Sequence, residues 1–173
     1  MDPGRLLRAL DLAATKHRDQ RRKDQQKSPY INHPIAVAQL MWECGIHDET
    51  AVLAGVLHDT IEDTATTRDE LAALFGDAVA DVVAEVTDDK SLPKARRKEL
   101  QVEHAPHLSH AAKLVKLADK TCNVRDVIDS PPDWPLERRQ LYLDWAMRVV
   151  DGLRDASPAL AARFDAQHAR GVS

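Results

Sequence analysis

Apolar residues recur with the spacing of amphipathic helices along most of the chain. A first helix is expected after the capping pair Asp2-Pro3, and a second begins at Pro34 and ends at Gly45. No stretch of four or more residues alternates cleanly between apolar and polar positions. The pattern therefore predicts an all-α protein. Further helices are expected over residues 49–59, 67–76, 77–86, 93–104, 109–119, 136–155 and 157 onward, with Asp48, Thr67, Asp77 and Ser109 as N-caps.

The segment 51–57 is apolar on every side, which is typical of a central helix. His58 and Asp59 follow it directly. A bare His-Asp pair carries little information by itself, because His47-Asp48 also occurs and a helix cap explains it. A carboxylate at the end of a buried helix is costly unless something compensates its charge, and a cation does so directly.

Two further residues point to the same ion. His33 precedes the rigid Pro34 at a helix entrance, and Asp119 ends the apolar stretch 114–118. With His58 and Asp59 they offer two imidazoles and two carboxylates, a mixed set that suits Mn²⁺, Fe²⁺ or Zn²⁺ and, with open positions, favours an octahedral ion. The alternative is that His33 is a capping residue and Asp119 an exposed acid.

Glu62 and Asp63 add acid–base capacity beside this pair. If the helix persists past residue 59, Glu62 lies over His58 and Asp63 over Asp59, one turn away. Both carboxylates could then carry protons to and from a water molecule held by the ion. The alternative is an ordinary acidic helix end, which the helix macrodipole disfavours at a C-terminus.

Basic residues gather in two short stretches, although the net charge of −4 excludes a generally basic nucleic-acid binder. Residues 16–27 hold six basic side chains, among them Arg22 and Lys23, and residues 90–98 hold five, among them Lys94 and Arg97. The two clusters favour a polyanion of limited size. Solvated helix and loop faces are the alternative. Asn123 follows Asp119 by four residues, so it faces the same way on a continuing helix.

The length of 173 residues fits one domain, 1–173, with a sizeable core. Two cysteines without a CxxC spacing indicate a reducing compartment, and the first residues lack the basic-then-apolar pattern of a signal segment. The longest apolar runs are far shorter than the roughly 20 residues that span a bilayer. A cytoplasmic protein without a membrane or nucleic-acid partner is expected, either a monomer or a homodimer.

Several longer motifs, in order, resemble the HD-domain hydrolases of the RelA/SpoT type, and most closely their small stand-alone members in animals. The resemblance runs from about residue 9 to residue 150, and it implies a compact HD-domain bundle of about eight to ten helices. The matching stretches are residues 17–24, 29–34, 57–64, 85–90 and 112–120, followed by Asn123 and Arg125.

This resemblance also implies roles for single residues. By it, His33, His58, Asp59 and Asp119 bind one Mn²⁺ per chain, Glu62 and Asp63 are the catalytic acidic pair, and Arg22, Lys23, Asn123 and Tyr142 bind the substrate. The implied activity removes the 3′-diphosphate from guanosine tetra- and pentaphosphate, (p)ppGpp, and releases pyrophosphate with GDP or GTP.

One departure from the family pattern bears on specificity. Relatives commonly carry a bulky pair where this chain has Thr121-Cys122. Two smaller residues there are expected to widen the base pocket, which leaves the preference for guanine open. The rival functions are a phosphatase of another phosphorylated nucleotide, such as NADPH, and a catalytically silent sensor that binds the alarmone without cleaving it.

Overall fold

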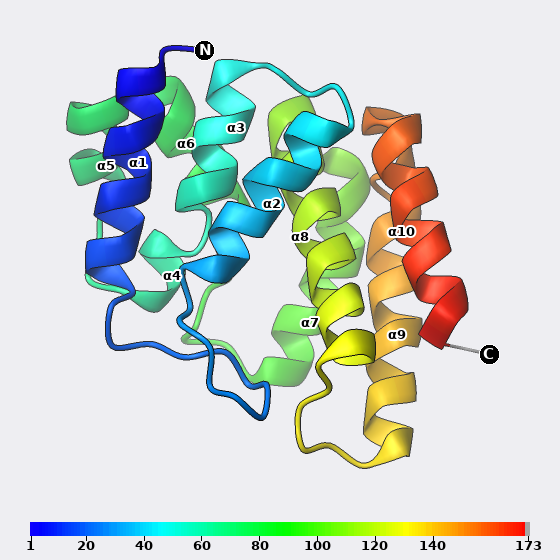
Figure 1. The fold of residues 1–173 in the computed structure, drawn as a ribbon. Helices are drawn as coiled ribbons and strands as arrows, with labels where there is room; N and C mark the ends of the chain where they lie inside the picture. Colours follow the sequence, from blue (N-terminus) through cyan, green and yellow to red (C-terminus); the bar gives the residue numbers. More distant parts are fainter. Residues whose placement is uncertain (172–173) are drawn as a thin grey trace.

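The computed structural model describes residues 1–171 and consists almost entirely of helices (Figure 1). Within this described part, the one β-type pairing is an isolated bridge between Arg21 and Pro29. The all-α prediction is confirmed. The helices are α1 (Pro3–Lys16), α2 (Asn32–Glu43), α3 (Glu49–Leu57), α4 (Thr60–Asp63), α5 (Arg68–Phe75), α6 (Asp77–Val86), α7 (Lys94–His104), α8 (His110–Asp129), α9 (Leu136–Asp151) and α10 (Pro158–Gly171), with short 3₁₀ turns η1 (Ala105–His107) and η2 (Arg154–Ala156).

Helices α3 and α8 form the centre of the molecule. Every residue from Ala51 to Leu57 is buried, and α3 packs against α1, α2, α6 and α8. Helix α8 in turn packs against α2, α6, α9 and α10, so that it lies between the two ends of the chain (Figure 1). The prediction of a central helix over 51–57 is therefore confirmed. No helix among the described residues has the length and apolar character needed to cross a membrane.

A glycine sets the distance between α2 and α3. A Cβ atom added at Gly55 would lie 2.9 Å from Met41 Sδ and 3.7 Å from Val37 Cγ1. Both neighbours are buried side chains of α2. The absence of a side chain at residue 55 thus lets the two helices approach closely in a core where little space is left.

Three of the four predicted N-caps of the later helices are confirmed. The side chains of Asp48, Thr67 and Ser109 accept backbone N–H groups in the first turns of α3, α5 and α8. The prediction for Asp77 is wrong, because Asp77 is the first residue of α6 and its carboxylate accepts a hydrogen bond from Arg68 at 2.7 Å. Gly76, at a φ of 91°, takes the cap position instead, and this left-handed conformation turns the chain sharply between α5 and α6.

Four helix boundaries differ from their predicted positions, the first being the start of α2 at Asn32, two residues before Pro34. Helix α3 ends at Leu57, and His58-Asp59 forms a turn before the short helix α4. Helix α8 continues ten residues beyond Asp119, where Cys122, Val124 and Val127 are buried against the core. Helix α9 stops at Asp151, where Gly152 brings the chain against η1 too closely for a Cβ atom.

Candidate metal centre and adjoining cavities

His33, His58, Asp59 and Asp119 meet in one buried cluster, although they come from three separate parts of the chain. His33 lies in the first turn of α2 and Asp119 lies in the middle of α8, with His33 Nε2 3.0 Å from Asp119 Oδ1. His58 and Asp59 form the turn between α3 and α4. The alternative in which Asp119 is an exposed acid is wrong, because only 8% of its surface is exposed.

The hydrogen bonds of His58 determine which ring nitrogen can bind an ion. Its Nδ1 donates to the carbonyl oxygen of Gly55 at 2.8 Å, so that the neutral ring carries its lone pair on Nε2. This nitrogen is buried without a hydrogen-bond partner, 3.0 Å from Asp59 Oδ2 and 3.6 Å from Asp119 Oδ1. Three acceptors that converge in this way require positive charge between them, and a divalent metal ion fits this donor set.

Electrostatics favour a cation at the same place. Burial alone would lower the pKa of His58, but the charges of Asp59 and Asp119 outweigh burial and raise this pKa well above its ordinary value. Burial would likewise raise the pKa of Asp119, yet the charge of Lys120 and the hydrogen bond from His33 hold it well below its ordinary value. The cluster therefore keeps its carboxylates ionised and attracts positive charge.

Three further side chains orient the two carboxylates. The hydroxyl of Tyr30 donates to Asp59 Oδ2 at 2.5 Å. Lys120 Nζ donates to Asp119 Oδ2 at 3.1 Å, and Asn123 Nδ2 donates to Asp119 Oδ1 at 2.6 Å. Partners of this kind fix the direction in which a ligand's lone pairs point. Of the three, Asn123 was expected to face Asp119 because of its helical spacing.

Glu62 and Asp63 lie next to Asp59, but not because the helix persists. The helix breaks at His58-Asp59, and α4 starts again at Thr60, with the N–H of Asp63 bonded to the carbonyl of Asp59 at 2.9 Å. Carboxylate oxygens of Asp59, Glu62 and Asp63 lie within 4.8 Å of one another. The expected proximity of Glu62 and Asp63 to Asp59 is thus confirmed, but a turn at His58-Asp59 produces it and not a continuous helix.

The two acids are held differently. Glu62 is largely buried, accepts the backbone N–H of Asp88 at 2.7 Å, and has its pKa raised chiefly by burial. Asp63 is half-buried as well and forms an ion pair with Lys90. Gln20 donates to its backbone carbonyl at 2.8 Å. One carboxylate is therefore suited to accepting a proton, and its neighbour is held in place by Lys90.

A buried lysine supports this arrangement, and sequence reasoning missed it. Lys116 Nζ donates to the carbonyl of Val86 at 3.0 Å, just before the backbone N–H of Asp88 that holds Glu62. Gln101 Nε2 donates to Asp88 Oδ2 at 2.6 Å and braces the same segment from α7. The signal in the sequence was a lysine inside an apolar run, because burying an ammonium group without a hydrogen-bond partner costs free energy.

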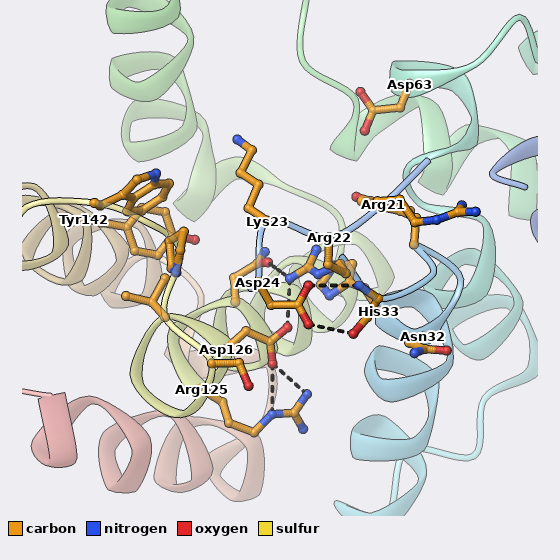
Figure 2. A pocket seen from close by; sticks show the side chains of 17 residues that line it. Arg21, Arg22, Lys23, Asp24, Asn32, His33, Asp63, Arg125, Asp126 and Tyr142 are labelled. Atoms are coloured by element: carbon orange, nitrogen blue, oxygen red, sulfur yellow. Dashed lines mark hydrogen bonds and ion pairs between the residues drawn. The ribbon is translucent and has the colours of Figure 1, made fainter. Parts of the chain in front are cut away.

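A cavity of about 570 Å³ opens beside the cluster, and four expected substrate-binding residues line it. Arg22 donates to Asn123 Oδ1 at 3.1 Å and to Asp126 Oδ2 at 2.8 Å, so its guanidinium is already fixed (Figure 2). Lys23 extends away from this pair, with Nζ 6.0 Å from the ring centre of Trp134. Tyr142 lies on the other side of the cavity in Figure 2. The structure therefore brings Arg22, Lys23, Asn123 and Tyr142 together.

The expected effect of Thr121 and Cys122 on this cavity is wrong. Both residues are buried, and neither lines the large cavity. They line a separate space of about 130 Å³ between α2, α8 and α10. On the continuous helix α8, Thr121 points to the side opposite Asn123, and Cys122 is fully buried. The small pair changes core packing there and not the wall of the large cavity.

Comparison with known proteins identifies the class. Residues 9–148 match the sequence model of the HD domain family, and this span covers most of the chain. The chain belongs to the HD domain family.

The similar proteins narrow the comparison to one kind of enzyme within this family. The chain is 51% identical to the guanosine-3′,5′-bis(diphosphate) 3′-pyrophosphohydrolase MESH1 of Xenopus tropicalis, over 95% of this chain and 93% of that protein. It is 53% identical to the human MESH1, over 92% and 90% of the two chains. A solved structure described as a metazoan ortholog of SpoT that hydrolyses ppGpp superimposes with a TM-score of 0.93 at 45% identity, covering 96% of this chain and 95% of that one.

Proposed function

We propose that this protein hydrolyses (p)ppGpp at the 3′-diphosphate and releases pyrophosphate with GDP or GTP. The observation that carries the proposal is the buried convergence of His33, His58, Asp59 and Asp119 next to a cavity lined by basic and aromatic side chains. The similarity to pyrophosphohydrolases of this name, over nearly the full length of both chains, supports the choice of substrate.

The four clustered side chains hold one divalent ion, for which Mn²⁺ is the proposed identity. Two imidazoles and two carboxylates meet the ligand preferences of Mn²⁺, and Fe²⁺ and Zn²⁺ are the other ions that this set suits. When bound, such an ion would supply positive charge for a phosphoryl oxygen and would make a water molecule more acidic. Metal analysis of protein purified without added metal tests its identity.

Glu62 and Asp63 act on the attacking water, Glu62 by moving a proton and Asp63 by orienting the molecule. A water molecule attacks the phosphorus bonded to O3′, Glu62 takes up a proton from that water, and the O3′–P bond breaks. The 3′-oxygen then receives this proton back from Glu62, and pyrophosphate leaves with the oxygen of the water. Burial suits Glu62 to this task because it raises the pKa of its carboxyl group. Asp63, held by Lys90, orients the water.

The decisive experiment follows products. Guanosine tetraphosphate is incubated with the protein, with and without Mn²⁺, and anion-exchange chromatography resolves the products. GDP and pyrophosphate in equal amounts, formed only with the ion, are expected. Intact substrate that remains bound to the protein would instead identify a sensor. A parallel incubation with NADPH that gives a higher kcat/KM would identify the other nucleotide phosphatase.

Neutralising the basic loop should weaken substrate binding. Lys23→Met is expected to raise KM by roughly tenfold at low salt with little change in kcat, because a phosphate contact present in both ground and transition states is uniform binding. Arg22→Gln should act similarly, although it also removes a partner of Asp126. The effect should shrink as salt rises. Steady-state kinetics measure this, with Arg18→Met, an exposed residue near the loop, as control. An unchanged KM in the Lys23 variant would make the loop an ordinary solvated surface.

Removing the buried ammonium of Lys116 should lower kcat by about tenfold or more, because small misplacements of a catalytic group are costly. Lys116→Met keeps the length of the side chain but loses its bond to Val86. KM and metal content should stay near wild type. Lys113→Met is a matched control, since Lys113 is equally buried on α8 but pairs with Asp155. Partial recovery in Lys116→Arg is expected, and equal kcat values for the two methionine variants would contradict the positioning role.

We also propose that residues 1–173 form one domain that works in the cytoplasm, as a monomer or homodimer. A single hydrophobic core with contributions from most helices supports the first point, and the free thiols of Cys44 and Cys122 suit a reducing compartment. No nucleic-acid or membrane partner is expected at a net charge of −4. Light scattering after gel filtration distinguishes the monomer from the dimer.

A further inference from the structure

A buried histidine outside the metal cluster contacts the supports of two site residues. His17 directly follows α1, close to α4, and only 1% of its surface is exposed (Figure 1). Its ring centre lies 4.9 Å from that of Tyr30, whose hydroxyl donates to the proposed metal ligand Asp59. Its Nδ1 lies 2.7 Å from Oε1 of Gln20, whose side chain also reaches the backbone carbonyl of Asp63. Two short routes thus lead from His17 to the site.

The bonds of Gln20 determine where the His17 ring carries its proton. A carbonyl oxygen can only accept a hydrogen bond, so the amide nitrogen of Gln20 must face the carbonyl of Asp63, to which it donates at 2.8 Å. Oε1 of Gln20 is then left to accept from His17, and this bond requires the proton on Nδ1. The three groups therefore form one directed chain of hydrogen bonds that ends at the backbone of Asp63.

The other nitrogen of the His17 ring shows that packing alone does not explain this residue. Among the described residues, His17 Nε2 is buried without a hydrogen-bond partner. An unsatisfied buried acceptor costs free energy, whereas a phenylalanine ring would fill a similar space without this cost. The bond from Nδ1 to Gln20 is the interaction that a histidine makes here and a phenylalanine cannot.

Backbone bonds between the same residues close the loop that carries Arg22 and Lys23. The N–H of Gln20 donates to the carbonyl of His17 at 2.9 Å, and the N–H of Tyr30 donates to the carbonyl of Gln20 at 3.2 Å. The two ends of the loop therefore stay together without any help from side chains. A substitution at His17 can thus disturb its side-chain contacts without opening this loop.

We infer that His17 is a positioning residue for the reaction, which acts through Tyr30 on Asp59 and through Gln20 on Asp63. The inference rests on the proposed function, in which Asp59 binds the ion and Asp63 orients the attacking water. His17 lines neither the large cavity nor the cavity of the metal cluster, so it acts only through these neighbours. It sets the placement of the ion relative to the water, where an error of about 1 Å is costly to kcat.

Two substitutions separate the two routes. His17→Phe keeps a ring against Tyr30 but cannot donate to Gln20, so kcat should fall by about tenfold while the Kd of Mn²⁺ stays near wild type. His17→Asn keeps a donor near the place of Nδ1 but loses the ring, so the Kd of Mn²⁺ should rise by about tenfold while kcat at saturating Mn²⁺ stays near wild type. KM should change in neither variant, because the backbone bonds of the loop remain.

Steady-state kinetics and Mn²⁺ titration of the same samples measure these effects. A wild-type kcat in His17→Phe would overturn the inference. Equal losses of kcat and of Mn²⁺ affinity in both variants would overturn it as well, since His17 would then be only a packing residue. His168→Phe is the matched control, because His168 on α10 also has a buried Nε2 without a partner, and its ring centre lies 5.7 Å from that of Phe164. Its kcat and Kd should not change.

A second variant interrupts the route to Asp63 from its other end. Gln20→Met lies at a half-buried position and should reproduce the loss of kcat seen in His17→Phe. The double variant should lose no more than either single variant, because both substitutions break the same chain of hydrogen bonds. Additive losses would contradict the shared route. Should His17→Phe fail to fold, kcat of Gln20→Met decides the question.

NMR separates this inference from the proposed function, because it needs no substrate. In protein with isotope-labelled imidazole nitrogens, the proton of His17 should be on Nδ1, and the spectrum of His17→Phe identifies the His17 signals. A proton on Nε2 would refute the inference even if the wild-type protein hydrolyses (p)ppGpp. If the protein cleaves another nucleotide instead, the proposed function fails, and the same kinetic comparison with that nucleotide still decides the role of His17.

Discussion

Replacing Asp119 with alanine is expected to abolish both metal binding and hydrolysis. Asp119 on α8 connects His33 of α2 to the turn after α3, so the ion joins helices that are distant in sequence. Its removal also leaves Lys120 buried without its carboxylate, and breaking a buried ion pair in this way costs about 3–5 kcal/mol. Metal content by mass spectrometry, thermal unfolding and product formation measure the three effects.

The metal contribution to stability can be separated from that of the ion pair. An ion at 1,000 times its Kd stabilises a folded protein by about 4 kcal/mol, or roughly 8 °C or more in Tm for a chain of this size. Mn²⁺ should therefore raise the Tm of wild-type protein and leave that of Asp119→Ala unchanged. Asp155→Ala removes a carboxylate that pairs with another α8 lysine and should keep the response to Mn²⁺. Full activity of dialysed wild-type protein in excess EDTA would refute the metal mechanism.

Glu62→Gln and Asp63→Asn should each lower kcat by roughly 100-fold or more while the protein keeps its ion. Both substitutions preserve the shape of the side chain but remove its ability to accept a proton. Glu62→Gln should have the larger effect, because burial raises the pKa of the Glu62 carboxyl group and so suits it to accepting a proton. Single-turnover kinetics with metal analysis on the same samples measure both quantities.

Asp89→Asn provides the control for this pair. Asp89 follows Asp88, the residue whose backbone N–H holds Glu62. Among the described residues the carboxylate of Asp89 bonds only to Ser91, so kcat of Asp89→Asn should not change. Loss of the ion from either Glu62→Gln or Asp63→Asn would mean that the residue is a ligand and not a proton carrier.

The helices and the buried cluster were predictable from local signals. Capping residues, prolines and glycines mark most helix boundaries, and an acid next to an apolar run marks Asp59 and Asp119 as unusual. The extension of α8 past Asp119 was missed although Cys122, Val124 and Val127 continue its apolar pattern and are buried. The contact of Asn123 with Arg22, which comes from a distant loop, also stabilises this half and leaves no local signal.

The basic cavity lined by residues of α7 and α9 was only partly predictable from the sequence. Lys94 and Arg97 belong to a basic stretch that suggested a polyanion, but Arg138 and Trp145 lie some forty residues later on α9. Neither of these two residues stands out by spacing or by its neighbours. Their role depends on the packing of α7 against α9, which no periodicity records. The same holds for Lys116, whose partner is a backbone carbonyl.

The spacing of α2 and α3 at Gly55 has a chemical consequence. Gly55 faces Met41 and Val37 of α2, and its carbonyl oxygen receives the Nδ1 proton of His58. Gly55 thus sets both the distance between α2 and α3 and the orientation of the His58 ring. His33 lies on α2, the other helix of this pair. The distance between α2 and α3 therefore helps to set the geometry of the metal cluster. A methyl group added at residue 55 is chemically inert, so it would alter metal binding only by moving these helices and the ring of His58.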